Sequence, residues 1–469
     1  MPPSQPVAVS WSSAFPRSFR RPYPQAVRGE GVWLYDAAGK RYLDFSGSAA
    51  VNFVGHGVRE IADALAEQAR TLEFAHTSQF ATPVAEEFAQ ELLAFAGEGF
   101  KGGCVYFTSS GSEAIETALK LARQYQVEIG QKQRNKFASR NQSYHGATLG
   151  AVGVSGNARR RELYLPLVAD SAKVSIPYCY RCHYDCGSRL EAGRESCGAR
   201  YAGELADLLS THGRETAAFL FEPVSGATLG AAVPPADYLP EVARTCARHG
   251  VLTIADEVMT GMGRTGRNFA VDHWPGVHSE AQPDILVTAK GVASGYAPLG
   301  AVIASRKVVT AIAAGSGAFV HGLTYNAHPI ATAAGHAVLR KIVKEKLVAR
   351  ADSGGQAGSA MATELKRLRS LDSVGDVRGL GLLWGVEFVA DKDTKRPFDA
   401  ALGFSQRVAE AAIRRGLLVY PMQGCVDGYA GDHLLLAPPA VITPEEITTA
   451  VTQLAESITE AASGATRAK

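Results

Sequence analysis

PDILVTAKGVASG, residues 283–295, places a lysine directly after a run of mostly apolar residues. An apolar run of this length, from Asp284 to Ala289, is typical of a strand that is buried on both faces of a parallel sheet. A lysine at such a strand end can simply extend to solvent. If apolar and small residues enclose it, its pKa falls and the amine becomes a usable nucleophile. The stretch predicts a buried sheet and makes Lys290 a candidate functional residue.

Similar apolar runs recur from about residue 100 to 330 and alternate with amphipathic stretches. They are CVYFTSS (104–110), AAFLFEP (217–223), GVLTIADEV (250–258), DILVTAK (284–290) and GAVIAS (300–305). This alternation predicts an α/β domain in which helices cover a mainly parallel sheet.

The last third of the chain has a different pattern. Residues 328–371 are helical in composition, and GDVRGLGLLWGVEFVA (375–390) predicts a strand pair in a separate α+β lobe. Near the N-terminus, GVWLYDAAGKRYLDFSGS (31–48) predicts a hairpin that we expect to join this lobe. We therefore divide the chain into an N-terminal segment of the small domain (1–60), a large domain (61–330) and a C-terminal small domain (331–469).

Composition favours small-molecule chemistry. The 469 residues include 48 basic and 46 acidic ones, and no basic block suggests a nucleic-acid or membrane surface. No segment reaches the roughly 20 apolar residues of a membrane span, and the N-terminus lacks the apolar core of a signal peptide. We expect a cytoplasmic protein that binds neither nucleic acid nor membrane.

A second polar residue follows another buried run. In GVLTIADEVMTGMGRTG (250–266), Asp256 ends a mostly apolar strand, and a buried carboxylate needs a cation or a strong donor. A protonated pyridine nitrogen would satisfy it. The alternative is an ordinary helix N-cap. Because ligands bind outside the carboxyl ends of parallel strands, we expect Asp256 and Lys290 to face one site.

A phosphate site is predicted in VYFTSSGSEAIETALKLARQY, residues 105–125. A strand is followed by Ser110, Gly111 and Ser112 and then by a predicted helix. Backbone N–H groups, hydroxyls and the helix dipole at such a turn favour a phosphate. Plain helix capping is the alternative.

An aromatic cover for a ring is offered by SYHGATLGA, residues 143–151. Tyr144 and His145 lie there in a loop punctuated by glycine. An aromatic face stacked on a pyridine ring adds packing energy and fixes the plane of the ring. Core packing alone also explains Tyr144.

Together these motifs resemble the class III aminotransferases of pyridoxal-phosphate fold type I. The resemblance runs in order from about residue 30 to 450 and includes FEPV (221–224) and HGLTYNAHPIATAAG (321–335). It implies a large pyridoxal-phosphate-binding α/β domain with a mainly parallel seven-stranded sheet, plus a smaller α+β domain built from both ends of the chain. It also implies a homodimer with active sites at the interface.

The resemblance assigns roles to individual residues. Lys290 would be the Schiff-base and proton-transfer lysine, and Asp256 would hold the pyridinium of pyridoxal 5'-phosphate. Val258 would lie on the ring face opposite Tyr144, and Glu222 near the ring oxygen. The phosphate would meet Ser110, Gly111, Ser112 and, from the neighbouring subunit, Thr324.

The implied reaction moves an amino group from a primary amine or ω-amino compound to a keto acid or aldehyde by a ping-pong mechanism. Lys290 would transfer the proton as a general acid and base. A lyase or aminomutase of the same fold, acting on an amino alcohol phosphate or a related amine, is the alternative. A catalytically silent scaffold is disfavoured because Lys290, Asp256 and the phosphate turn are all present.

Substrate recognition departs from the family pattern. No arginine or lysine occurs from Gly416 to Thr466, and Leu434 stands where many members carry a carboxylate-binding arginine. We predict a donor without a carboxylate at its reacting end. The predicted pocket residues are Ala49, Ala50, Phe80 and Tyr420.

Four cysteines cluster in a charged insertion: Cys179, Cys182, Cys186 and Cys197. Four thiolates can hold zinc, and the first pair has the C-x2-C spacing of ligands. The second pair lacks that spacing, so a loop packed by small polarisable side chains is the alternative. We expect no metal in the catalytic set itself.

Overall fold

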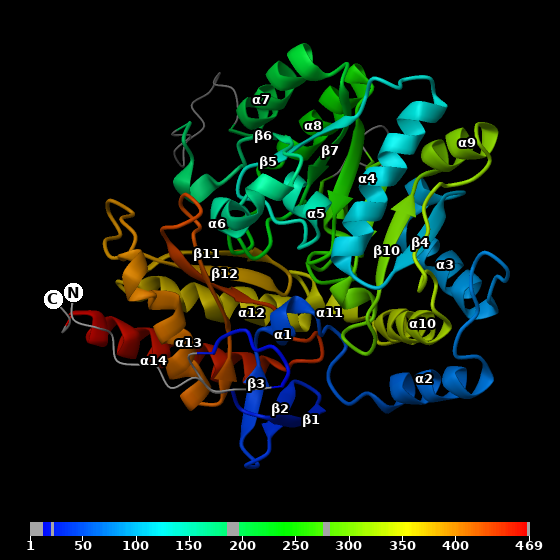
Figure 1. Cartoon of the computed structure of the whole chain (residues 1–469). Helices are drawn as coiled ribbons and strands as arrows, with labels where there is room; N and C mark the ends of the chain where they lie inside the picture. Colours follow the sequence, from blue (N-terminus) through cyan, green and yellow to red (C-terminus); the bar gives the residue numbers. More distant parts are fainter. Residues whose placement is uncertain (1–12, 20–22, 185–196, 275–281, 467–469) are drawn as a thin grey trace.

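The computed structural model describes residues 13–19, 23–184, 197–274 and 282–466. Within them, a seven-stranded sheet in the order β4-β10-β9-β8-β7-β5-β6 forms the large domain (Figure 1). Its strands are β4 (Cys104–Thr108), β5 (Lys136–Arg140), β6 (Ala172–Val174), β7 (Thr216–Phe221), β8 (Leu252–Asp256), β9 (Ile285–Thr288) and β10 (Gly300–Ala304). Strand β10 is antiparallel to both neighbours, and the other pairings are parallel. The prediction of a mainly parallel sheet is confirmed.

Strands β5 and β6 did not stand out in the sequence. Strand β5 reads KFASR and β6 reads AKV, so neither is a continuous apolar run. Both lie at one edge of the sheet, where β5 pairs with β7 and β6 with β5. Pairing with neighbouring strands stabilises these segments despite their composition.

Both faces of the sheet are covered, which explains the apolar runs. In β7, Ala218 and Leu220 pack with helix α4, whereas Phe219 and Phe221 belong to the core on the opposite face. Helices α4 (Gly111–Glu128), α5 (Leu149–Val154) and α9 (Arg306–Ala314) supply one layer. Helices α3 (Pro83–Ala96), α7 (Cys197–His212), α8 (Tyr238–His249) and α10 (Pro329–Lys344) supply the other.

The small domain contains two four-stranded sheets. One is β1 (Ala26–Glu30), β2 (Trp33–Asp36), β3 (Arg41–Asp44) and β13 (Leu417–Leu418). The other is β11 (Val374–Leu380), β12 (Leu383–Phe388), β15 (Asp432–Leu436) and β14 (Tyr420–Gln423). Their helices are α11 (Leu347–Ala351), α12 (Gln356–Lys366), α13 (Phe404–Arg414) and α14 (Pro444–Thr466). The predicted strand pair is β11 and β12, which are antiparallel.

The N-terminal hairpin joins the C-terminal lobe as predicted. Strands β2 and β3 are antiparallel, and β3 pairs in parallel with β13. Trp33 Nε1 also donates to Glu446 Oε1 in α14 at 3.1 Å. In Figure 1 the blue strands accordingly lie beside the orange and red helices.

The two domains share a buried junction at Arg264. Its guanidinium donates to the carbonyl oxygens of Asn52 at 2.7 Å and Ala437 at 2.9 Å. Burial lowers the pKa of Arg264 to about 9. Helix α2 (Arg59–Thr71) packs against α10. The predicted divisions at residues 60 and 330 lie at the starts of these two helices and stay a prediction. Among the described residues, no helix is long and apolar enough to cross a bilayer.

Candidate active site

The carboxyl ends of β8 and β9 meet at a cavity of about 520 Å³. Nine of the predicted cofactor residues line it: Ser110, Gly111, Ser112, Tyr144, His145, Glu222, Asp256, Val258 and Lys290. Residues more than 100 positions apart in sequence are thus brought together by adjacent strand ends.

Lys290 stands two residues beyond β9, at the floor of this cavity. Its backbone has φ of +34°, and Ser294 in the same turn has φ of +51°. Residues other than glycine seldom adopt a positive φ. Such a conformation persists where the surrounding structure enforces it. Ser294 Oγ accepts from the N–H groups of Phe53 and Val54 at 2.7 and 3.1 Å, so the turn is held by the N-terminal segment.

The Lys290 amine has altered proton affinity. Burial lowers its pKa to about 8, while the negative charges of Asp256 and Glu222 act in the opposite direction. A larger fraction of this amine is therefore neutral at pH 7 than for an exposed lysine, whose usual value is 10.5. A neutral amine is the form that attacks a carbonyl group.

Asp256 ends β8 and pairs with His145. Its Oδ2 accepts from His145 Nδ1 at 2.7 Å, and its Oδ1 accepts from Val258 N at 3.0 Å. The second contact closes a local turn, and no helix begins there in the described chain, so the alternative of a helix N-cap is wrong. His145 therefore buttresses Asp256, a role that the sequence did not reveal when it grouped His145 with the aromatic cover. Among the described residues, His145 Nε2 has no hydrogen-bond partner.

Glu222 follows β7 and is buried beside the same cavity. Its Oε1 accepts from Gly226 N at 3.0 Å, whereas its Oε2 has no hydrogen-bond partner within the described part of the chain. Burial raises the pKa of Glu222, and the neighbouring Asp256 carboxylate acts in the same direction. The free oxygen can accept a hydrogen bond from a ligand.

The predicted phosphate turn begins helix α4. Ser110 is the N-cap, and its Oγ accepts from Glu113 N at 3.2 Å. Ser112 Oγ accepts from Ala147 N at 2.9 Å. Both hydroxyls thus have structural partners, and the capping alternative is confirmed for Ser110 only. The first N–H groups of the helix still lack intrahelical partners and can bind an anion.

Tyr144 and Val258 border the cavity. A Cβ atom added to Gly111 would lie 3.1 Å from a methyl group of Val258. Glycine at position 111 therefore avoids a tight contact with the Val258 side chain. The guanidinium of Arg160 lies 4.6 Å from the centre of the Tyr144 ring, a cation–π distance. Arg160 was not among the predicted residues, although the basic run ARRR in α6 (Ala158–Arg161) is visible in the sequence.

Other predicted residues lie outside the cavity of a single chain. Phe80 is 63% exposed, Thr324 is exposed, and Tyr420 lies half-buried in β14. Ala49 and Ala50 belong to α1 (Gly47–Ala50), a turn with left-handed residues, and the adjacent Val51 lines the cavity instead. Their place in a substrate or cofactor site stays a prediction.

Sequence reasoning also missed part of the cavity wall. It includes Val51, Val224, Ala227, Met259, Thr260, Ala289 and residues 295–299. Several of these lie within a few residues of Asp256 or Lys290 in the chain, so their proximity to the predicted site was an available signal.

The cysteine insertion is described only in part, because Cys186 lies outside the described residues. Cys179 and Cys182 are free thiols, whereas Cys197 is disulfide-bonded. The Sγ atoms of Cys182 and Cys197 are 3.1 Å apart. Among the described residues, no group of three or more His, Cys, Asp or Glu is placed to hold a metal ion. Because Cys197 is disulfide-bonded, zinc binding by all four cysteines would require reduction of that bond, and metal analysis of the reduced protein tests this hypothesis.

Comparison with known proteins identifies the family of the chain. The family model of aminotransferase class-III matches residues 16–458. A relative from Bacillus subtilis, named uncharacterized aminotransferase YodT, is 38% identical over 440 residues, covering 93% of this chain and 95% of the relative. The adenosylmethionine-8-amino-7-oxononanoate aminotransferase of Geobacter sulfurreducens is 34% identical, with 92% and 91% covered.

Solved structures give the same result for the fold. An amine transaminase from an uncultivated Pseudomonas species, in its PLP-bound form, has a TM-score of 0.86 and 33% identity, covering 96% of this chain and 98% of that one. An (S)-enantioselective omega-transaminase from Thermomicrobium roseum has a TM-score of 0.86 and 34% identity, with 96% of each chain covered. The chain belongs to the class III aminotransferase family.

Proposed function

We propose that this chain is a pyridoxal-phosphate-dependent aminotransferase that moves an amino group from a primary amine or ω-amino compound to a keto acid or aldehyde. The carrying observation is that the Lys290 amine and the Asp256–His145 pair face one cavity from adjacent strand ends. Relatives named as aminotransferases and transaminases support the reaction class.

The polar atoms of the cavity fit this cofactor. Glu222 Oε2 is buried and available to a ligand, and the start of α4 offers N–H groups to a phosphate. Asp256 would hold a protonated ring nitrogen, and Tyr144 and Val258 would contact the ring.

Lys290 and Asp256 have distinct tasks in this proposal. When bound, pyridoxal phosphate supplies an electron sink for the α-proton of an attached amine. Lys290 Nζ takes that proton and returns it to another carbon, and the lowered pKa of its amine suits both directions. Contacts at both oxygens, from His145 Nδ1 and from Val258 N, fix the orientation in which the Asp256 carboxylate would face the cofactor.

Arg160 is our candidate for binding the carboxylate of a keto acid acceptor. It is half-buried above Tyr144, and within the described residues no carboxylate pairs with its guanidinium. Besides burial, the charge of Arg160 contributes to lowering the pKa of Lys290, so its field reaches the reacting amine. An unpaired arginine recognises carboxylates well.

The donor side is apolar in this proposal. Leu434, which replaces the arginine of many family members, is fully buried in β15, and Tyr420 in β14 pairs with the adjacent Leu435. This arrangement supports a donor whose reacting end has no carboxylate. A kcat/KM for a simple α-amino acid far above that for every primary amine would contradict it.

We also propose a homodimer. Phe80, Val320 and Tyr325 are exposed apolar residues, and Asn326 Nδ2 donates to Thr77 Oγ1 at 3.5 Å, which links their two segments. An exposed apolar surface of this kind favours association. Thr324 lies in the same surface and would reach the neighbour's phosphate. Light scattering of the purified protein measures the assembly.

The first experiment is an absorbance titration of the pyridoxal-phosphate-loaded protein without acceptor. Primary amines, amino acids and phosphorylated amino alcohols serve as donors, with Lys290→Arg as the matched control. We expect the visible band to bleach with particular amines while the corresponding carbonyl compound forms. Consumption of amine with release of ammonia or phosphate and a persistent band would indicate the lyase alternative. No band in the wild-type protein would contradict the proposal.

A further inference from the structure

Residues 222–232, here called the Glu222 loop, form a wall between the cavity and the small domain. Glu222, Val224 and Ala227 line the cavity. Ser225 N donates to Ala232 O at 3.0 Å, which closes the loop on itself. The opposite side of the loop contacts strands β11, β12 and β15 of the small domain. The position of a cofactor-facing carboxylate thus depends on a contact made behind it.

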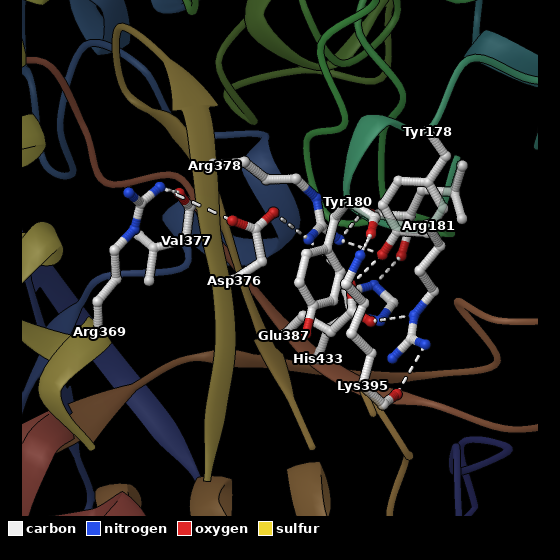
Figure 2. A network of polar contacts seen from close by, with 12 residues as sticks. Tyr178, Tyr180, Arg181, Arg369, Asp376, Val377, Arg378, Glu387, Lys395 and His433 are labelled. Carbon is white, nitrogen blue, oxygen red and sulfur yellow. Dashed lines mark hydrogen bonds and ion pairs between the residues drawn. The ribbon is translucent and has the colours of Figure 1, made fainter. Parts of the chain in front are cut away.

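Arg378 of β11 makes the first of these contacts. Its Nη2 and Nε donate to Leu229 O at 2.5 and 3.2 Å. Its Nη1 donates to Asp376 at 3.0 Å and to Glu387 at 2.9 Å (Figure 2). Burial alone would lower the pKa of Arg378, but Tyr178 and the carboxylates of Glu387 and Asp376 raise it. The guanidinium therefore stays charged and is a fixed donor to the loop.

His433 of β15 makes the second contact. Its Nε2 is 2.8 Å from Ala227 O, and a carbonyl oxygen requires the proton on that nitrogen. Burial, assisted by the charge of Arg378, lowers the pKa of His433 to about 4. The ring is neutral at physiological pH and carries one proton, which it donates to the loop carbonyl.

Glycines allow the loop and the sheet to approach closely. Gly230 has φ of +55°, and a Cβ atom there would lie 2.7 Å from His433 Cδ2. A Cβ atom on Gly385 of β12 would lie 2.0 Å from Gly230 O. No other residue type fits this backbone contact without displacing it.

The network extends away from the loop through Glu387. This fully buried carboxylate accepts from Arg181 Nε at 2.7 Å and from the Tyr178 hydroxyl. Figure 2 shows these side chains converging between β12 and the loop that bears Tyr178. Arg369 lies at the far side, where its Nη2 donates to Val377 O at 2.6 Å. Arg369 offers a control site in the same network.

We propose that Arg378 and His433 are positioning residues, through which the small domain places the Glu222 carboxylate at the cofactor site. The inference rests on the proposed function, because its target is the cofactor-facing side of Glu222. His433 acts through Ala227 O, and Arg378 acts through Leu229 O. Neither residue touches the reacting atoms.

The test compares His433→Leu with His433→Gln. Leucine removes the donor to Ala227 O, whereas glutamine can place an N–H near the position of Nε2. Pyridoxal phosphate affinity of the cofactor-free protein and the pH midpoint of the visible band of the loaded protein are measured. We expect His433→Leu to weaken pyridoxal phosphate binding about 3- to 10-fold, which corresponds to the loss of one hydrogen bond. His433→Gln should restore most of this affinity.

The pH midpoint reports on Glu222 itself. The charged or titratable groups that face it are Lys290, Asp256, His145 and Arg140. The negative charge of Glu222 raises the proton affinity of the group at Lys290. If His433→Leu displaces the Glu222 carboxylate, the pH midpoint of the visible band should therefore move to lower pH. Glu222→Gln should do the same, and His433→Leu should add no further shift in that background.

Arg369→Gln separates positioning from stability. It should lower the melting temperature while leaving the affinity and the midpoint at wild-type values. The proposal is overturned if His433→Leu leaves both values unchanged, if Arg369→Gln moves them equally, or if His433→Leu still shifts the midpoint in the Glu222→Gln background. Absence of a band in the wild type would overturn the proposed function and this role with it, whereas a wild-type band insensitive to His433 would overturn only the role.

Discussion

The floor and the rim of the active site are built in different ways. The floor, defined as His145, Glu222, Asp256 and Lys290, comes from one domain and is held by short, buried contacts. The rim, defined as Ala49, Phe80, Thr324 and Tyr420, comes from scattered segments and does not line the cavity of a single chain. We predict that the floor fixes the chemistry and that the rim determines the choice of substrate.

The largest expected effect tests the floor at Lys290. Lys290→Ala removes the amine that moves the proton, so kcat should fall by at least about 10³-fold. Steady-state assays with an amine and a keto acid measure it. Lys290→Arg retains a positive charge without the nucleophile and serves as the control. Near-normal kcat in either variant would show that the floor is not the catalytic centre.

Asp256→Asn tests the charged partner on the neighbouring strand. The amide keeps the size of the side chain but removes the negative charge, and kcat should fall about 10²- to 10³-fold. Glu257→Gln is the matched control, because this adjacent buried carboxylate accepts from Val271 N at 2.8 Å and burial raises its pKa to about 7. Equal losses in the two variants would remove the distinction between Asp256 and its structural neighbour.

The floor also predicts a pH dependence. In the cofactor-free protein, acetylation of Lys290 by acetic anhydride should increase with pH through a midpoint of about 8, because only the neutral amine reacts. Exposed lysines have a usual pKa of 10.5. At pH 7 their acetylation rate, as a fraction of their own high-pH rate, should be about two orders of magnitude lower than the same fraction for Lys290. Peptide mass spectrometry measures both in one sample. A Lys290 midpoint near 10.5 would contradict the buried environment.

Arg160→Met tests whether this arginine at the edge of the site binds the carboxylate of a keto acid. Loss of a charged donor should lower kcat/KM for keto acids about 10- to 100-fold and leave aldehyde acceptors unaffected. Arg159→Met is the neighbouring control, since Arg159 is exposed and donates to Gln423 Oε1 at 2.6 Å. Equal losses for keto acids and aldehydes would show a structural role for Arg160 instead.

The smallest effect concerns the phosphate turn. Ser110→Ala removes the N-cap of α4 and should lower the free energy of unfolding of the cofactor-free protein by about 1 kcal/mol. Urea denaturation measures it, with Ser210→Ala at an exposed position of α7 as the control. An unchanged midpoint would mean that the hydroxyl of Ser110 has no capping role.

Within the floor, the positions of Lys290 and Asp256 were predictable from the sequence, whereas the contact of Asp256 with His145 was not. Lys290 and Asp256 stand at the ends of apolar runs, and parallel strand ends necessarily meet at one edge of a sheet. The partner of Asp256 was not predictable in this way, because His145 reaches it from a loop 111 positions away. The basic run in α6 is visible in the sequence, but the contact of Arg160 with Tyr144 depends on how α6 packs.

The fold shows the same division. Apolar runs identified β4, β7, β8, β9 and β10, whereas the polar strand β5 and the three-residue strand β6 depend on pairing with neighbours. The reversed direction of β10 also left no signal in the sequence, because antiparallel and parallel strands buried on both faces have the same apolar pattern.

The parallel pairing of Leu43 with Leu417 has a consequence for the order of folding. During synthesis the N-terminal hairpin leaves the ribosome long before strand β13 exists, and a hairpin without further strands is marginally stable. The intervening sheet of the large domain can form first, since domains fold largely as units. The small domain should close last, so pulsed proteolysis during refolding should find residues 26–44 protected only after the central sheet. The wall of the cavity that rests on the small domain would then acquire its shape in the final step of folding.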